Sequence, residues 1–178
     1  FGFGYDTYGI QKFISSEDKN VSSVPNALAL FNPAVVLAPI EGLPLDEVSK
    51  KKSDGIEARL GVEPSKLSPV HHVRKDLPPC VIFHGEADTT VRIQTVEKFA
   101  ELMTKAGNRC ELHRFADAPH GFFNARADGG NGAKAGQRKG AKSAKATSAV
   151  EQRHGWHEQT LKQLDDFLVS LNWLPAAK

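Results

Sequence analysis

The sequence predicts an α/β protein that contains the last strands of a doubly wound, mostly parallel sheet. Three short apolar runs suited to buried strands occur along the chain, and an amphipathic helix separates the second run from the third. Strands joined by crossover helices pair in parallel, because each helix returns the chain to the edge where the previous strand began. Three strands with few helices would leave sheet edges bare, so we expect further strands upstream of this sequence.

The bulk composition is that of one ordinary globular domain. The chain has 178 residues, of which 40% are hydrophobic and 25% charged, and its net charge is +2. So small a charge gives no indication of a nucleic-acid partner or an acidic membrane surface. No apolar run approaches the roughly 20 residues that a membrane helix requires. Cys80 and Cys110 each begin an apolar run, and we expect both to be buried free thiols.

The three apolar runs differ in pattern. Residues 27–36 begin as a continuous apolar run, typical of a strand buried on both faces, and Pro33 is expected to end its hydrogen-bonded part. Residues 80–84 form a second predicted strand of the same continuous kind. Residues 110–115 alternate more strongly between apolar and polar side chains and form the third predicted strand.

Three helices are predicted around these strands. A short helix over Asp54–Leu60 is followed by Gly61, which suits a helix C-cap. A helix over Ile93–Ala106 repeats apolar residues at spacings of three and four, which marks its core face. A final helix over Trp156–Leu171 is predicted to pack through a stripe of four leucines, namely Leu161, Leu164, Leu168 and Leu171.

Residues 125–150 differ in composition from the rest of the chain. Gly, Ala, Lys and Ser dominate, and no acidic residue lies between Gly129 and Val150. Such a segment has little to bury, so we expect a mobile insertion in a single partial domain over residues 1–178. No aromatic side chain interleaves its basic residues, so we expect no nucleic-acid binding by this stretch, which comprises Lys134, Arg138, Lys139, Lys142 and Lys145.

Two residues with catalytic potential follow consecutive predicted strands. Asp88 lies in the turn after residues 80–84, and His120 lies in the loop after residues 110–115. Neighbouring parallel strands lie roughly 4.8 Å apart and their loops emerge at one sheet edge, so the two side chains can meet. Open α/β sheets place their sites at that edge. A carboxylate that orients a histidine, which in turn accepts a serine proton, is the acid–base pair of a catalytic triad.

The sequence around both residues resembles the catalytic loops of a known superfamily. Residues 84–88 (HGEAD) resemble the acid loop of prolyl-oligopeptidase-like and dienelactone-hydrolase-like α/β-hydrolases, and residues 118–124 (APHGFFN) resemble their histidine loop. The order Asp before His suits the Ser…Asp…His order of α/β-hydrolases. The resemblance covers about residues 25–175 apart from 125–150.

This resemblance implies that the chain is the C-terminal part of an α/β-hydrolase sheet. It implies a serine hydrolase that acts on carboxylic esters, similar to acetylesterases, with Asp88 as the acid and His120 as the base of the triad. No metal or organic cofactor would take part. The implied substrate is a small-molecule or polysaccharide ester.

The nucleophile of such a triad is not found in these residues. The sequence contains no G-x-S-x-G nucleophile elbow. The nearest candidates, Ser15, Ser16 and Ser143, have neither flanking glycines nor a preceding strand. We therefore expect the serine upstream and expect this chain alone to be inactive. Two alternatives remain open: a peptidase of the prolyl-oligopeptidase type, and a non-catalytic remnant or accessory domain.

Other residues near the pair have simpler interpretations. His84 is expected to be structural and to hold the acid turn by a hydrogen bond. Glu86 is an alternative acid that we expect to face solvent. Phe122 either lines an acyl or alcohol pocket or packs in the core. No H-E-x-x-H pattern or second ligand pair accompanies the other histidines, so we predict no metal site at His71, His72, His113, His154 or His157.

Overall fold

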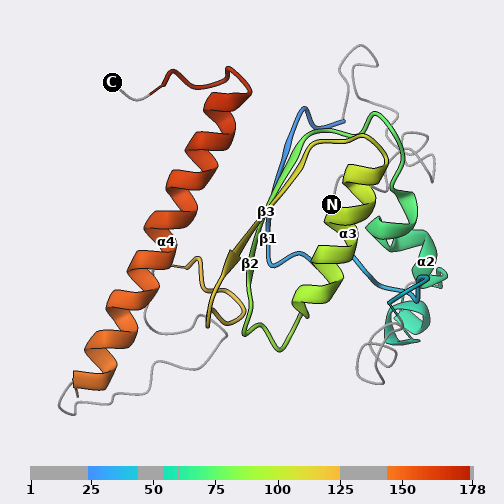
Figure 1. The fold of residues 1–178 in the computed structure, drawn as a ribbon. Coiled ribbons are helices and arrows are strands. Elements are labelled where there is room, and N and C mark those ends of the chain that lie inside the picture. The colour runs from blue at the N-terminus through green and yellow to red at the C-terminus, as the bar shows by residue number, and fades with distance from the viewer. Residues whose placement is uncertain (1–23, 44–53, 60, 125–143, 177–178) are drawn as a thin grey trace, which may run out of the picture.

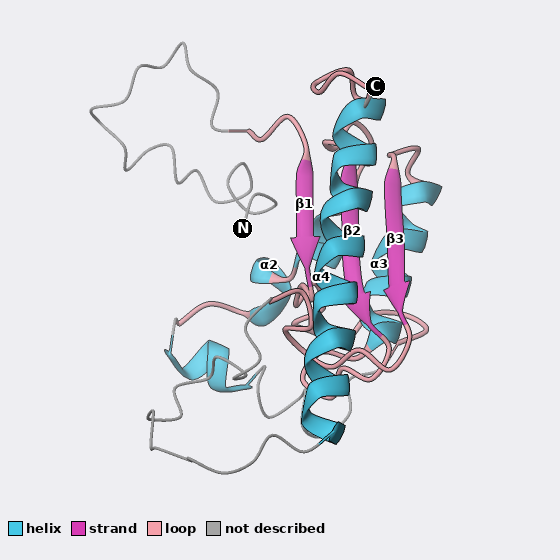
Figure 2. Cartoon of the chain, turned by 90° about the vertical axis from the view of Figure 1, so that its left-hand side faces the viewer, coloured by secondary structure: helices cyan, strands magenta, loops and turns pink. Residues whose placement is uncertain are grey.

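A parallel sheet forms the centre of the structure, a computed structural model that describes residues 24–43, 54–59, 61–124 and 144–176, with the backbone alone for 144–150. Its strands, in spatial order, are β1 (Leu28–Phe31), β2 (Cys80–Gly85) and β3 (Cys110–Phe115). Both pairings are parallel, so the three carboxyl ends lie at one edge (Figure 2). Helix α3 (Ile93–Lys105) covers one face and α4 (Ala144–Ser170) the other (Figure 1). The predicted α/β class and doubly wound parallel arrangement are confirmed.

The central strand β2 is buried at all six positions. Its side chains alternate between the two faces: Cys80 and Ile82 pack with the α3 side, whereas Val81 and Phe83 pack with the α4 side. A strand covered on both faces needs apolar residues at successive positions, which explains its continuous apolar run. The predicted bounds of β2 and β3 agree with the structure to within one residue.

Helix α3 forms as its periodicity predicts. Val96, Phe99 and Met103 have no exposed surface, and each such side chain contributes roughly 1.5–3 kcal/mol through its burial. The helix ends where Gly107 adopts a φ of +84°, a conformation that glycine enters without steric penalty. The N–H of Gly107 is donated to the carbonyl of Thr104, which closes the last turn.

Helix α4 begins at Ala144, twelve residues before the predicted start at Trp156. The end of the predicted insertion at residue 150 is therefore wrong, because residues 144–150 are helical. Their composition suits a helix, since three of the seven residues are Ala and one is Lys, and both types are strong helix formers even where little is buried. Residues 125–143, with most of the basic stretch, lie outside the described residues. No described helix combines the length and apolarity needed to cross a membrane.

The inward face of α4 is rotated from the predicted leucine stripe. Leu164, Leu168 and Leu171 pack against the sheet, but Leu161 is 48% exposed. The most buried positions are Thr160 and Phe167, which lie two turns apart on one face. The stripe prediction is therefore wrong for Leu161, because the helix turns the Phe167 ring into the core between β2 and β3.

The first strand is less buried than predicted. Ala29 is exposed and the other residues of β1 are only half-buried, because β1 has a single strand neighbour, β2, within the described sheet. The short helix predicted before Gly61 is present over residues 54–59, and the Gly61 N–H is donated to the Glu57 carbonyl at 2.8 Å. Two single turns that were not predicted follow it: α2 (Pro64–Leu67) and η2 (Pro69–His72).

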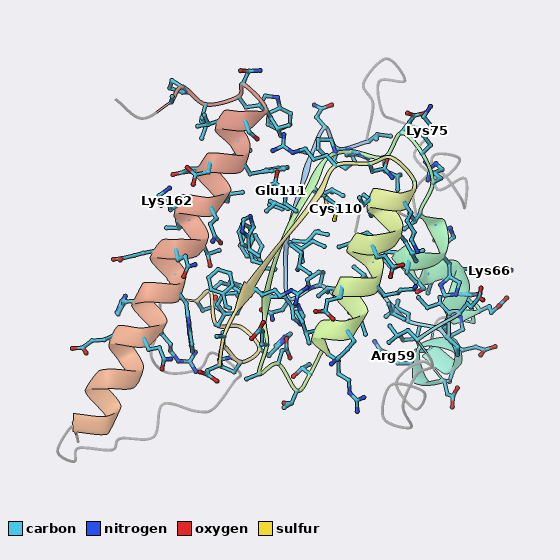
Figure 3. The ribbon with its side chains drawn as sticks, viewed as in Figure 1. Arg59, Lys66, Lys75, Cys110, Glu111 and Lys162 are labelled. Atoms are coloured by element: carbon cyan, nitrogen blue, oxygen red, sulfur yellow. The ribbon has the colours of Figure 1, made fainter. Side chains whose placement is uncertain are left out.

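The two cysteines occupy paired positions at the start of β2 and β3. Both are free, and their sulfur atoms lie 3.2 Å apart. Cys80 is fully buried, whereas Cys110 is only half-buried, so the predicted burial holds fully for one of them. Figure 3 shows Cys110 on the side of β3 that faces α3. This pair lies at the amino edge of the sheet, away from the loops that carry Asp88 and His120.

The last residue of β2 is a steric constraint on the whole carboxyl edge. A Cβ at Gly85 would lie 2.1 Å from the carbonyl oxygen of Ala118, which already accepts the N–H of Ala87 at 3.1 Å. We expect Gly85→Ala to lower the free energy of unfolding by about 1–3 kcal/mol or more, because the loop after β3 must move away and lose that bond. Urea denaturation measures this change.

Gly155→Ala is the matched control. Nothing lies within 4 Å of a Cβ at this helical position, so alanine should stabilise the helix by roughly 0.5–1 kcal/mol. An unchanged urea midpoint for Gly85→Ala would contradict the close contact between the two loops.

Candidate active site

Asp88 lies in the turn that follows β2, and its side chain is fully buried. One carboxylate oxygen, Oδ1, accepts the backbone N–H of Thr90 at 2.8 Å and that of Val91 at 2.9 Å. Aspartate favours such turns because its short side chain reaches the backbone two or three residues further along. The other oxygen, Oδ2, is left to face the neighbouring loops.

The ring of His120 contacts Oδ2 of Asp88. Its Nδ1 lies 2.8 Å from Asp88 Oδ2. An ionised carboxylate can only accept, so Nδ1 carries the proton and Nε2 of the neutral ring is the basic atom. The side chain of His120 is 42% exposed, and no described residue forms a hydrogen bond with Nε2. The arrangement therefore presents a proton acceptor at the surface, oriented from behind by a buried carboxylate.

Backbone contacts set the relative position of the two loops. The N–H of Glu86 is donated to Phe115 at the end of β3, at 2.9 Å, and the N–H of Ala87 to Ala118. The close approach of Gly85 to Ala118 brings the same two segments together. In the histidine loop, Gly121 adopts a φ of +74°, which lets the chain turn directly after His120. The prediction that the two loops emerge at one sheet edge is confirmed.

A third segment reaches the acid. Asn32, the first residue after β1, donates from Nδ2 to Asp88 Oδ2 at 2.7 Å, and this contact is buried. Its Oδ1 faces the N–H of Gly121 at 3.4 Å. The sequence analysis assigned Asn32 no role. The signal that could have identified it is a polar residue directly after a strand that ends at the same sheet edge as β2 and β3.

His84 has the structural position that was predicted for it. Its Nε2 lies 2.9 Å from the carbonyl of Val91, which ends the acid turn, and 3.7 Å from Asp88 Oδ2. Burial lowers the pKa of His84 below its ordinary value despite this hydrogen bond and the nearby carboxylate. The ring is therefore neutral at physiological pH and acts as a hydrogen-bond donor to Val91.

Asp88 shows the opposite balance. Burial favours its neutral form, but the N–H of Val91, the ring of His120 and the N–H of Thr90 together outweigh that effect. The pKa of Asp88 consequently lies below its ordinary value. The carboxylate is ionised at neutral pH, as the partner of a catalytic histidine must be.

Phe122 packs in the core rather than facing a pocket. It has no exposed surface, and its ring lies 4.5 Å from that of Phe115 and 6.2 Å from that of Trp156. The structure thus supports the packing alternative and not a substrate contact, because a side chain with no accessible surface cannot touch an ester. The ring instead anchors the loop that carries His120.

The remaining candidates are placed as follows. Glu86 is exposed, as expected for a residue that faces solvent. Ser15, Ser16 and Ser143 lie outside the described residues. Within the described part of the chain, no group of three or more His, Cys, Asp or Glu side chains is arranged to hold a metal ion.

Comparison with solved structures finds esterases. The chain is 39% identical to esterase 2 of the Planctomycetes species Thermogutta terrifontis in its propionate-bound form, with a TM-score of 0.63, 92% of this chain covered and 49% of that one. For the butyrate-bound form the identity is 39%, the TM-score 0.64 and the coverage 92% and 50%. For the form phosphoramylated by tabun these values are 40%, 0.61, 92% and 48%. The chain thus spans about half the length of these structures. No curated protein matches it.

A family model also matches the sequence of this chain. The model described as the dienelactone hydrolase family matches residues 47–164, a range that includes β2, α3, β3 and both loops of the acid–base pair. The parallel sheet, the buried carboxylate beneath an exposed histidine and this match agree, and the chain belongs to the dienelactone hydrolase family.

Proposed function

We propose that the protein containing this chain is a serine hydrolase of carboxylic esters in which Asp88 and His120 are the acid and base of a catalytic triad. The observation that carries this proposal is the 2.8 Å contact between His120 Nδ1 and Asp88 Oδ2 at the carboxyl edge of the sheet. The ionised state of Asp88 and the exposure of the His120 ring support the same roles.

In the proposed mechanism, His120 Nε2 takes the proton of a serine hydroxyl supplied by a segment that precedes this chain. The serine oxygen attacks the ester carbonyl, and His120 returns the proton to the departing alcohol. A water molecule then gives its proton to Nε2 and attacks the acyl carbon. His120 returns this proton to the serine oxygen as the carboxylic acid leaves. Asp88 keeps the histidine tautomer and stabilises the imidazolium that forms in each half-reaction. The acid–base steps need no metal ion or organic cofactor.

The similar esterase supports a proposal for the substrate class. Structures of Thermogutta terrifontis esterase 2 hold propionate or butyrate, which are the acids released from short acyl esters. That enzyme is also phosphonylated by sarin and phosphorylated by paraoxon, reactions typical of an activated nucleophile. We propose short acyl esters of a small alcohol or a polysaccharide as substrates for the present protein.

A different function class has one observation in its favour. The 178 residues contain no G-x-S-x-G motif, which a non-catalytic remnant or accessory domain would also lack. Treatment with paraoxon, followed by mass spectrometry of peptides, separates the two hypotheses. Phosphorylation of one serine outside these residues supports the hydrolase. A full-length protein that is neither labelled nor active on esters supports the accessory domain.

His120→Ala tests the base. In the full-length protein we expect kcat for p-nitrophenyl propionate to fall by at least about 1,000-fold, because the serine loses its proton acceptor. The urea midpoint should change little, since the His120 side chain is 42% exposed and Asp88 keeps its hydrogen bonds to Asn32, Thr90 and Val91. His71→Ala, at an exposed histidine outside the site, should retain full activity. Near-normal hydrolysis by His120→Ala would remove the triad assignment.

Asp88→Asn tests the charge of the acid through its pH dependence. The pKa of Asp88 is lower in the folded state than in the unfolded chain, so its ionisation stabilises the fold above the ordinary value of about 3.9. We expect the substitution to lower the free energy of unfolding by about 1–3 kcal/mol at pH 7. This difference should persist down to about pH 4 and disappear as the pH falls through the lower folded-state pKa.

Urea denaturation at a series of pH values measures this effect, with Glu86→Gln as the exposed control in the same turn. A wild-type stability that runs parallel to that of Asp88→Asn from pH 7 to pH 2 would argue against an ionised, hydrogen-bonded Asp88.

A further inference from the structure

Asn32 occupies a backbone position that would favour glycine if no side chain were needed. It is the first residue after β1, and its N–H is donated to the Phe83 carbonyl at 2.9 Å, which continues the ladder between β1 and β2. Its φ is +43°, a left-handed conformation that glycine adopts freely and asparagine better than most other residues. Asn32 is 5% exposed, so its amide needs hydrogen-bond partners inside the protein.

The amide donates to the same carboxylate oxygen that binds the histidine. Asn32 Nδ2 lies 2.7 Å and His120 Nδ1 2.8 Å from Asp88 Oδ2, while Oδ1 is occupied by the N–H groups of Thr90 and Val91. Each carboxylate oxygen therefore has two donors. With Asn32 in place, the carboxylate plane cannot rotate without losing a hydrogen bond, and the remaining acceptor direction of Oδ2 points at His120.

The other end of the amide faces the loop that carries the base. Asn32 Oδ1 faces the N–H of Gly121, the residue directly after His120, at 3.4 Å. The side chain of Asn32 thus contacts Asp88, which follows β2, and Gly121 in the loop after β3. The backbone of Asn32 itself extends β1. This task needs a donor and an acceptor on one short side chain, and an amide provides both.

We infer that Asn32 is a positioning residue that fixes the Asp88 carboxylate and thereby holds the His120 ring in its active orientation. This inference rests on the proposed triad, because Asn32 would act only through Asp88 and His120. It assigns to a residue outside the acid and histidine loops a part in the turnover of the enzyme.

Asn32→Gly in the full-length protein is the primary test. Glycine suits the left-handed backbone and removes only the amide. We expect kcat for p-nitrophenyl propionate to fall about 10- to 100-fold, with KM changed less than about twofold, because misorientation of the base slows chemistry and not ester binding. Asn172→Gly is the matched control: Asn172 has a φ of +60°, is exposed and lies after α4, so kcat should not change.

A double-mutant cycle shows whether the effect passes through the acid. In an Asp88→Ala background, Asn32→Gly should lower kcat no further, because the carboxylate that it positions is gone. A wild-type kcat for Asn32→Gly, or a fall that multiplies with that of Asp88→Ala, would overturn the inference. The same cycle keeps the two proposals apart: activity in Asp88→Ala refutes the triad, whereas loss there with full activity in Asn32→Gly refutes only the role of Asn32.

Asn32→Asp keeps the test informative if the glycine variant folds poorly. The introduced carboxyl group has the shape of the amide, but it can form a hydrogen bond with Asp88 only when one of the two carboxyl groups is protonated. Repulsion between the two carboxylates favours uptake of this proton, and the protonated fraction rises as the pH falls. We expect kcat relative to the wild type at the same pH to rise as the pH falls from 8 to 5.5. A ratio independent of pH would contradict the donor role of Asn32.

Discussion

The buried carboxylate of Asp88 is the constraint on which the rest of this edge depends. A charge removed from water is strongly unfavourable unless donors replace its hydration. Here four donors do so: two backbone N–H groups of its own turn, the ring of His120 and the amide of Asn32. These donors follow three different strands. All four hydrogen bonds therefore form only when the three strand ends are in register.

Strand β2 provides the rigid support for this network. Its six residues are buried between α3 and α4, and the turn that carries Asp88 follows its carboxyl end. Gly85 lets the histidine loop approach so closely that the backbone atoms of the two loops touch. The position of His120, the proposed base, is thus set by packed backbone and not by a flexible side chain, which is what a preorganised site requires. Phe122 also fixes the position of His120, because its buried ring anchors the loop beside that residue.

Burial has opposite outcomes for two titratable groups of one turn. His84 loses its charge, since its hydrogen bond to Val91 and the nearby carboxylate do not compensate for desolvation. Asp88 keeps its charge, since its donors outweigh the same effect. One turn therefore holds a neutral histidine, His84, and an ionised carboxylate, Asp88, only four residues apart. His120, which is partly exposed, is left as the histidine whose Nε2 is accessible from solution.

Local patterns determined much of this protein from sequence alone. The continuous apolar run of β2, the periodicity of α3 and the position of Asp88 and His120 after consecutive strands each depend on neighbouring residues, so each was predictable. The burial of Phe122 and the exposure of Leu161 were not. They depend on which face of a segment meets the sheet. The contact of Asn32 with Asp88 joins residues 56 positions apart. Only the tertiary structure decided it, because nothing in the local sequence of either residue encodes the register that brings β1 beside β2.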